Sequence, residues 1–149
     1  MPVFQAQDPT YETRVRESFT RQTLMATIGA RLALVAPGRV EIELPYRADL
    51  TQQHGFLHAG ITSAIADSAG GYAGYSLFPA GSSVLTVEFK INLTAPAAGE
   101  RFLAIGEVLK PGRTLCICRL EVLGITGETR TTVAVGQQTL FCLEDRPDH

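Results

Sequence analysis

The segment from His58 to about Phe78 constrains the fold more than any other part of this 149-residue sequence. Its larger apolar residues recur at helical spacing among alanine, glycine and serine, which predicts one long helix. Three of its residues are Gly70, Gly71 and Gly74, and each destabilises a helix interior by roughly 1 kcal/mol relative to alanine. A helix with this penalty is expected to pack closely on another element, and we expect a sheet that wraps around it.

Most of the remaining sequence has the pattern of strands. Apolar and polar residues alternate most clearly over Val84–Leu93, which predicts that Leu85, Val87, Phe89, Ile91 and Leu93 share one face. Further strands are predicted from about Ala30, from about Arg39, over Phe102–Leu109, over Leu115–Ile125 and from about Thr129 to Phe141. Strands joined by short turns are antiparallel. The predicted class is α+β, with an antiparallel sheet of about five to six strands and a long helix after the second strand.

A shorter helix is predicted near the amino terminus. Asp8 can cap its free amides, and Pro9 suits the first helical position. No repeat and no linker-like stretch divides the chain. We therefore expect a single domain over residues 1–149, with an N-terminal helical segment over residues 1–27 and a core over residues 28–141.

Charge and composition disfavour several classes of partner. The sequence has 13 basic and 15 acidic residues, so it has no positive surplus to neutralise a nucleic-acid backbone or anionic lipids. It contains no apolar run of 18 residues and does not begin with the pattern of a secretion signal. Cys116, Cys118 and Cys142 lack the spacing of zinc ligands. We expect reduced thiols, a cytoplasmic location, and neither nucleic acid nor membrane as a partner.

The densest polar cluster lies just before the predicted long helix and inside it. It contains His54 and His58, and Asp67 follows among small residues. A carboxylate on such a helix needs a polar partner, and both a structural and a functional role for Asp67 stay open. The three side chains form an alternative set of metal ligands, but no glutamate lies between the histidines as in helical zinc motifs. We expect no metal and no cofactor.

The cluster and a later strand together carry a family resemblance. The run Gln52-x-x-Gly55-x-x-His58-x-Gly60, then Asp67 nine residues after the histidine, then Thr86–Ala97, resembles hotdog-fold acyl-CoA thioesterases of the PaaI-like, phenylacetate-pathway type. The resemblance covers about residues 28–141. It implies a hotdog fold, in which the sheet wraps around one central helix. It also implies hydrolysis of a small aryl- or medium-chain acyl-CoA to the free acid and CoA.

The resemblance implies a role for each matching residue. Asp67 matches the acidic residue that acts as general base or nucleophile toward the thioester. Gln52 matches a position usually held by asparagine, which binds the thioester carbonyl or the attacking water. In His58–Gly60, at the start of the helix, Ala59 matches a glycine whose backbone N–H polarises that carbonyl. Thr86 matches a serine or threonine that helps to orient the water.

Candidate substrate contacts are less specific. Phe56 and the aromatic residues of the long helix are either an acyl-binding pocket or ordinary core. The basic residues Lys90, Lys110 and Arg113 are either contacts to CoA phosphates or solvated surface charges. Both interpretations stay open from the sequence.

The spacing of the motif predicts a site shared between two chains. His58 and Asp67 are nine residues apart, or about 13.5 Å along a helix axis, so they cannot both reach one carbon within one chain. We therefore expect a homodimer that pairs through Val84–Leu93, and a homotetramer as a dimer of dimers. Two alternatives are a non-catalytic acyl-CoA-binding regulator and an enoyl-CoA hydratase. A hydratase is expected to hold an Asp/His pair within one chain, and a regulator to carry a DNA-binding segment.

Overall fold

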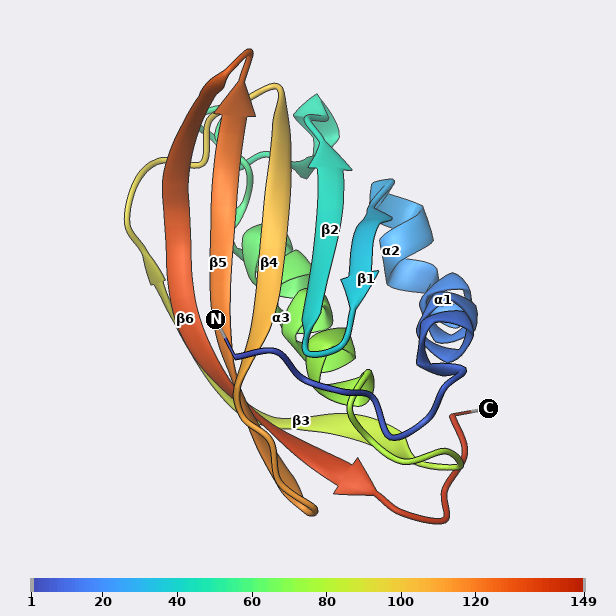
Figure 1. Ribbon diagram of the computed structural model, residues 1–149. Coiled ribbons are helices and arrows are strands. Elements are labelled where there is room, and N and C mark those ends of the chain that lie inside the picture. Colours follow the sequence, from blue (N-terminus) through green and yellow to red (C-terminus); the bar gives the residue numbers. More distant parts are fainter. Residues whose placement is uncertain (1, 149) are drawn as a thin grey trace.

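The computed structural model describes residues 2–148 and contains one antiparallel sheet curved around a central helix (Figure 1). The helices are α1 (Tyr11–Arg21), α2 (Thr23–Ile28), the short 3-10 helix η1 (Ala48–Leu50) and α3 (Ala59–Tyr75). The strands are β1 (Arg31–Ala36), β2 (Arg39–Pro45), β3 (Ser83–Leu93), β4 (Arg101–Lys110), β5 (Leu115–Thr126) and β6 (Thr129–Leu143). The predicted α+β class is confirmed. None of the helices described is long and apolar enough to cross a membrane.

The order of the strands in the sheet differs from their order in the chain. The order is β1-β2-β4-β5-β6-β3, so β3 pairs with β6 and not with its chain neighbour β4. Strand β3 lies at one end of the sheet, and one of its edges is free of pairing in residues 2–148. Its apolar residues Leu85, Val87, Phe89 and Leu93 are between 45% and 58% exposed. This strand is therefore an unpaired apolar edge in the single chain.

A β-bulge in β3 overturns the predicted alternation. The register with β6 shifts between Thr86 and Glu88, which leaves Val87 as the extra residue. Thr86 lies opposite Leu140, and Phe89 lies opposite Gln138. Both β6 partners are buried, and residues directly opposite each other share a face of the sheet. Thr86 and Phe89 therefore both face α3, although simple alternation placed them on opposite faces.

Helix α3 packs closely on the sheet, as its glycines predict, at two of the three positions. A Cβ at Gly70 would lie 2.0 Å from Gln138 Oε1, and a Cβ at Gly74 would lie 2.3 Å from Leu140 Cδ1. From the sheet side, a Cβ at Gly106 would lie 2.4 Å from the backbone of Ala69. The expectation is wrong for Gly71, where a Cβ would meet no atom within 4 Å.

The N-terminal region forms two helices where the sequence predicts one. The side chain of Asp8 accepts hydrogen bonds from the backbone N–H and the hydroxyl of Thr10, at 2.8 and 2.7 Å. Asp8 therefore caps a turn, and α1 begins only at Tyr11. The helix stops at Gln22, whose backbone is extended (ψ 91°), and α2 follows. At this break the side chain of Gln22 contacts Ser68 and Tyr72 of α3.

Arg14 of α1 holds the carboxyl end of α3. Its guanidinium donates to the backbone carbonyl oxygens of Tyr75, Phe78 and Pro79, at 3.1, 2.7 and 2.6 Å. These carbonyls lie at or just after the last turn of α3, where the helical hydrogen bonds end, although the carbonyl of Tyr75 also accepts from the backbone N–H of Phe78 at 3.1 Å. Arg14 also forms a buried ion pair with Asp8 at 3.2 Å. The N-terminal region is therefore tied to the end of the central helix.

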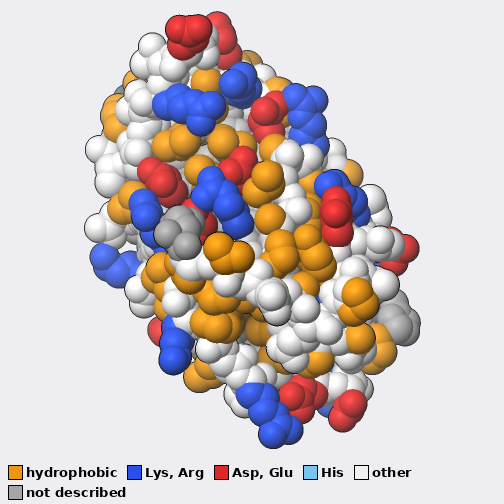
Figure 2. All heavy atoms as spheres, viewed as in Figure 1, with side chains coloured by type: hydrophobic (Ala, Val, Ile, Leu, Met, Phe, Trp, Pro, Cys, Tyr) orange, Lys and Arg blue, Asp and Glu red, His pale blue; other side chains and the backbone are white. Residues whose placement is uncertain are grey.

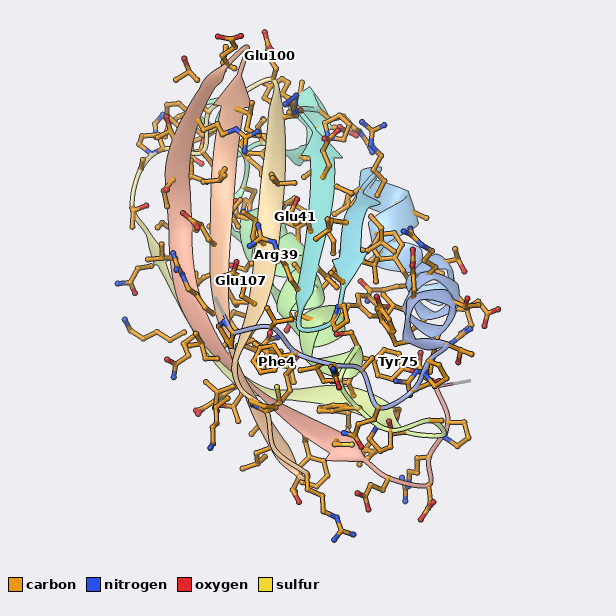
Figure 3. All side chains as sticks on the ribbon, in the orientation of Figure 1. Phe4, Arg39, Glu41, Tyr75, Glu100 and Glu107 are labelled. Atoms are coloured by element: carbon orange, nitrogen blue, oxygen red, sulfur yellow. The ribbon has the colours of Figure 1, made fainter. Side chains whose placement is uncertain are left out.

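The outer face of the sheet carries ion pairs among apolar side chains. Arg39 of β2 pairs with Glu41 of the same strand and with Glu107 of β4 (Figure 3). Figure 2 shows basic and acidic side chains interspersed with hydrophobic ones over this face. Phe4 packs on Gly38, in the turn between β1 and β2. The main buried side of the sheet is the side that carries α3, where the core residues of β2, β4, β5 and β6 lie.

Paired glycine substitutions test the packing of α3. Gly70→Ala is expected to lower the free energy of unfolding by about 1–3 kcal/mol, because its methyl group overlaps Gln138 and Leu120. Gly71→Ala is expected to raise it by about 0.5–1 kcal/mol, because the added methyl has free space and alanine favours the helix. Chemical denaturation of both variants measures the difference. Equal effects of the two substitutions would contradict the packing described here.

Arg14→Met tests how much the contacts of Arg14 with Asp8 and with the end of α3 stabilise the fold. We expect a loss of about 2–4 kcal/mol in the free energy of unfolding, because Asp8 and the three carbonyls lose a charged partner. Arg16→Met is the matched control on the same helix. Arg16 is half exposed and pairs only with Glu12, at 2.8 Å, so its loss is expected to stay within about 0.5 kcal/mol. Denaturation curves at neutral pH compare the two variants.

The ion pair between Asp8 and Arg14 also predicts that the free energy of unfolding depends on pH. Burial raises the pKa of Asp8, but the hydrogen bonds from Thr10 and the charge of Arg14 outweigh it, so the pKa is lowered overall. A lowered pKa stabilises the folded chain above the unfolded value of about 3.9, and this contribution is lost as the pH falls through the folded value. The difference between Arg14→Met and the unmodified chain is therefore expected to shrink below about pH 4.

Candidate active site

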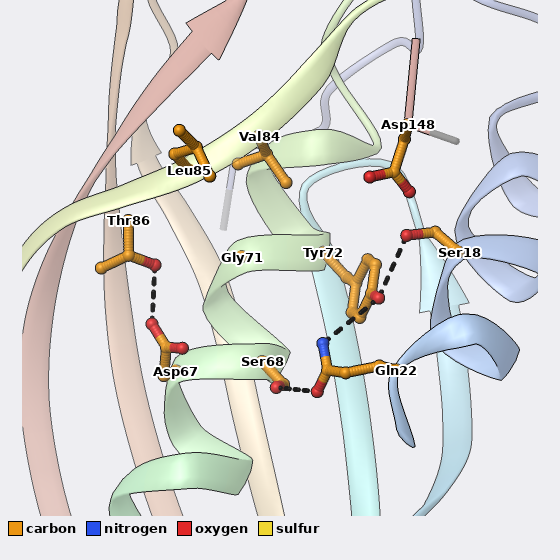
Figure 4. Close-up of a pocket in the computed structure, with 10 residues that line it drawn as sticks. All are labelled: Ser18, Gln22, Asp67, Ser68, Gly71, Tyr72, Val84, Leu85, Thr86 and Asp148. Atoms are coloured by element: carbon orange, nitrogen blue, oxygen red, sulfur yellow. Dashed lines mark hydrogen bonds between the residues drawn. The ribbon is translucent and has the colours of Figure 1, made fainter. Parts of the chain in front are cut away.

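The half-buried carboxylate of Asp67 is held through one of its two oxygens. Its Oδ1 accepts a hydrogen bond from Thr86 Oγ1 at 2.7 Å and one from Gln138 Nε2 at 2.5 Å. Within residues 2–148, Oδ2 has no hydrogen-bond partner. Figure 4 shows Asp67 and Thr86 facing each other between α3 and β3. Together they border a cavity of about 340 Å³, which we call the aspartate cavity. The geometry fixes the carboxylate and leaves one oxygen available to a substrate or water.

Gln138 is the residue of this site that the sequence analysis missed. It is 1% exposed, and its Nε2 also donates to the backbone oxygen of Asp67 at 3.1 Å and to Thr86 Oγ1 at 3.0 Å. The signal was present, because alternation along β6 places Gln138 on the buried face with Leu140 and Cys142. A polar residue at such a position needs a polar partner.

The hydroxyl of Thr86 is already engaged with two protein groups. Thr86 Oγ1 accepts from Gln138, and its single hydroxyl hydrogen is directed to Asp67. Toward a water molecule the hydroxyl can therefore act only as an acceptor. In this structure Thr86 donates to Asp67, and its role in orienting the water stays a prediction.

The opposite wall of the aspartate cavity combines a network of neutral polar groups with the carboxylate of Asp148. Ser68 donates to Gln22 Oε1 at 2.8 Å, and Gln22 Nε2 lies 3.4 Å from the hydroxyl of Tyr72 (Figure 4). Ser18 Oγ lies 3.1 Å from the same hydroxyl. Burial raises the pKa of Tyr72, so its phenol stays protonated. Of the aromatic residues of α3, Tyr72 borders this cavity, whereas Tyr75 is core and packs under Arg14.

A second cavity of about 480 Å³ lies at the start of α3. We call it the helix-start cavity, and it is lined by Gln52, His54, Phe56, Leu57, Ala59, Thr62 and residues 93–97. Phe56, predicted to contact the acyl group, lies here. The Oε1 of Gln52 accepts from the backbone N–H of His54 in a tight turn, which leaves the Nε2 of Gln52 as its available donor.

One backbone amide at the start of α3 is free. His58 caps the helix, and its Nδ1 accepts from the N–H of Gly60 at 2.8 Å. The N–H groups of Ile61 and Thr62 donate to the carbonyl oxygen of His58, at 2.9 and 3.0 Å. Ala59 N–H has no acceptor within the part of the chain that the structure describes. Of the amides of His58–Gly60 that the sequence pointed to, Ala59 is the one available to polarise a carbonyl, because Gly60 is already engaged.

The remaining predicted residues lie elsewhere. Lys90 is on β3 and donates to Asn92 at 2.7 Å. Lys110 ends β4, and Arg113 lies at the turn from β4 to β5, where it lines a separate cavity with residues 77–79 beyond the far end of α3. Hydrogen bonding to Glu144 raises the pKa of Arg113, as does the charge of that carboxylate. The basic residues therefore border neither of the two cavities.

The structure groups the predicted catalytic residues into two sets. Asp67 and Thr86 border the aspartate cavity, whereas Gln52 and Ala59 border the helix-start cavity. Among residues 2–148, no three His, Cys, Asp or Glu side chains come together as a metal site, so the alternative ligand set His54, His58 and Asp67 is not assembled within one chain.

Comparison with known proteins identifies the family. The model of the Thioesterase superfamily matches residues 54–131. A crystal structure of a thioesterase family protein from Silicibacter pomeroyi is 50% identical, with a TM-score of 0.88 over 90% of this chain and 98% of that one. A Saccharolobus solfataricus protein named as an esterase is 34% identical over 91 residues, 61% of this chain and 64% of that protein, so the match spans less than two thirds of it.

The fold comparison agrees with the family. The Escherichia coli PaaI protein, from the phenylacetic acid degradation operon, has a TM-score of 0.81 over 91% of this chain and 95% of its own, at 18% identity. This similarity shows a common fold and confirms the architecture that the motif predicted. The chain therefore belongs to the thioesterase superfamily, has the hotdog fold of PaaI-like proteins, and is a thioester hydrolase.

Proposed function

We propose that the protein hydrolyses a small aryl- or medium-chain acyl-CoA, with Asp67 as the base or nucleophile. The observation that carries this proposal is the carboxylate of Asp67, held through Oδ1 at the border of a cavity while Oδ2 is unengaged. A carboxylate fixed in this way can take a proton from water or attack a carbonyl carbon.

The start of α3 supplies the complementary electrophilic groups. A thioester carbonyl gains negative charge on oxygen during attack, and a backbone N–H at a helix N-terminus stabilises that charge. Ala59 N–H is free for this role, and the Nε2 of Gln52 is a second donor on the same cavity. With Asp67 as base, the oxygen of a water forms the new bond to the carbonyl carbon, the carbon–sulfur bond breaks, and the proton taken by Asp67 passes to the CoA sulfur. With Asp67 as nucleophile, its oxygen forms that bond and the CoA thiolate leaves. Water then hydrolyses the acyl-aspartate anhydride, which yields the free acid, restores the carboxylate and supplies the proton for the thiolate.

Strand β3 explains how the two halves of the site can meet. Its first part, Val84–Thr86, borders the aspartate cavity, and its last residue, Leu93, borders the helix-start cavity. If two copies pair antiparallel through the free edge of β3, the start of one strand lies against the end of the other. The aspartate cavity of one protomer then adjoins the helix-start cavity of its partner. A two-fold dimer has two such sites.

The surroundings of Asp67 favour a thioesterase over the alternative enzyme. An enoyl-CoA hydratase is expected to place a histidine beside the aspartate, but Asp67 is bonded to Thr86 and Gln138. His58 uses its Nδ1 as a helix cap.

Lys90 lies on β3, between the two ends that border the cavities, and we propose it as a contact to CoA phosphates. The three buried thiols are compatible with the cytoplasmic location that we propose.

A complementation experiment tests the shared site. Asp67→Asn removes the base in a nearly isosteric change and is expected to lower kcat by about 10²–10⁴. Ala59→Pro removes the free N–H without breaking the helix, because proline is well tolerated at the first helical position, and should lower kcat by about 10²–10³. His58 already has the extended backbone that precedes proline (φ −60°, ψ 137°). Thioester hydrolysis is followed by release of free thiol.

Mixing the two inactive variants separates a shared site from a site within one chain. After unfolding and refolding together, half of the dimers contain one chain of each kind. Each mixed dimer has one site with both groups intact, so roughly a quarter of the unmodified activity should return. No recovery, with both variants folded and mixed dimers present, would place the groups in one chain. Near-native kcat in Asp67→Asn alone would refute the proposed chemistry.

A charged residue on β3 tests the dimer itself. Val87 is 57% exposed, and Val87→Lys places a charge on the free edge, which disfavours strand pairing. We expect light scattering to show two or four chains for the unmodified protein and one chain, with activity lost, for the variant. Leu109→Lys is the control, since Leu109 is 52% exposed but lies on β4 inside the sheet. An active monomer in either protein would contradict the shared site.

A further inference from the structure

Gln138 is a polar side chain in an apolar position. Of the buried polar side chains in residues 2–148, it alone lies on a strand. It is placed on β6 opposite Phe89 of β3 and Cys118 of β5. On the α3 side it lies against Gly70, where any side chain would overlap it. Packing alone would favour an apolar residue here, as at the neighbouring inward positions Leu140 and Cys142.

The two ends of the Gln138 amide have opposite surroundings. The Nε2 contacts three acceptors, which are the Oδ1 and backbone oxygen of Asp67 and the hydroxyl of Thr86. The Oε1 is buried and has no hydrogen-bond partner in the part of the chain described. A buried amide oxygen without a partner is unfavourable, and few occur in folded proteins. The orientation of the amide is therefore set by its NH₂ group, which donates only to Asp67 and Thr86.

We propose that Gln138 is a positioning residue for the thioesterase reaction. It holds the Oδ1 of Asp67 and, by donating to Thr86, fixes the hydroxyl of Thr86 as a second donor to the same oxygen. Both contacts stop the carboxylate from rotating and keep Oδ2 toward the substrate. This inference rests on the proposed role of Asp67 as base or nucleophile. Gln138 does not touch the reacting atoms, so its effect passes entirely through Asp67.

Loss of this contact is expected to act on the chemical step. A catalytic group that is free to turn spends less time in the reactive geometry, and small misplacements lower rates by one to two orders of magnitude. Gln138→Met keeps the unbranched shape and removes the amide. We expect kcat to fall about 10- to 100-fold with KM changed less than about twofold.

The matched control is the same substitution one residue earlier. Gln137→Met alters a side chain that is exposed and forms no hydrogen bond within residues 2–148. It is expected to leave kcat, KM and the melting temperature unchanged. Gln138→Asn keeps the amide but shortens the side chain by one methylene, and it replaces Gln138→Met if that variant melts below the assay temperature. Its kcat is expected to lie between those of the unmodified protein and Gln138→Met.

A double-mutant cycle distinguishes positioning from a structural role. In an Asp67→Asn background, the carboxylate that Gln138 positions is already gone, so Gln138→Met should change the residual rate less than about twofold. An equal loss in both backgrounds would make Gln138 a structural residue and overturn the inference. Native kcat in Gln138→Met alone would also overturn it. Near-native kcat in Asp67→Asn would instead refute the proposed function, so the two failures are distinguishable.

Discussion

The close approach of the sheet to α3 is the constraint on which the rest of the structure depends. At Gly106 the strand β4 comes so near to α3 that a Cβ would lie 2.4 Å from the backbone of Ala69. At Gly70 the helix leaves room for the buried amide of Gln138. Only at this separation can a carboxylate on α3 reach hydroxyl and amide donors on β3 and β6. Gly70, which weakens the helix, and Gly106 on β4 are therefore two residues that allow the site to form.

The N-terminal region contacts α3 both at its carboxyl end and at the wall of the aspartate cavity. The guanidinium of Arg14 satisfies carbonyls beyond the last turn of α3, and Gln22 contributes its side chain to the wall of the aspartate cavity. Both contacts depend on where the N-terminal helices begin and end. The break at Gln22 weakens helix continuity locally, but it turns the Gln22 side chain toward Ser68 and Tyr72.

The sequence predicts much of the fold, because the signals for it are local. Helical spacing and strand alternation gave the central helix and the strands close to their observed bounds, and the motif pointed to Asp67, Ala59 and Thr86. It could not predict the pairing of β3 with β6, since alternation says nothing about which strands are neighbours. The alternation of residues also gave no sign of the bulge at Val87. Because the bulge adds one residue to β3, the side chains after it lie on the opposite faces of the sheet from those predicted. Alternation along β6 indicated that Gln138 is buried, but it could not indicate its partners, because they lie on two distant segments.

The length of a helix is what makes a second chain necessary in the proposed mechanism. A free amide can stabilise developing charge only at the first turn of α3, whereas the fixed carboxylate needs the middle of α3, where β3 and β6 are close. These two requirements separate Ala59 and Asp67 by roughly 12 Å along the axis, which is more than one reacting carbon can span. Strand β3 borders both cavities with its opposite ends and has an apolar free edge. Antiparallel pairing of that edge removes the separation without shortening the helix, because it exchanges the two ends between protomers. The same exposed residues that would make a single chain prone to association therefore become, in a dimer, the border between the base and the oxyanion donor.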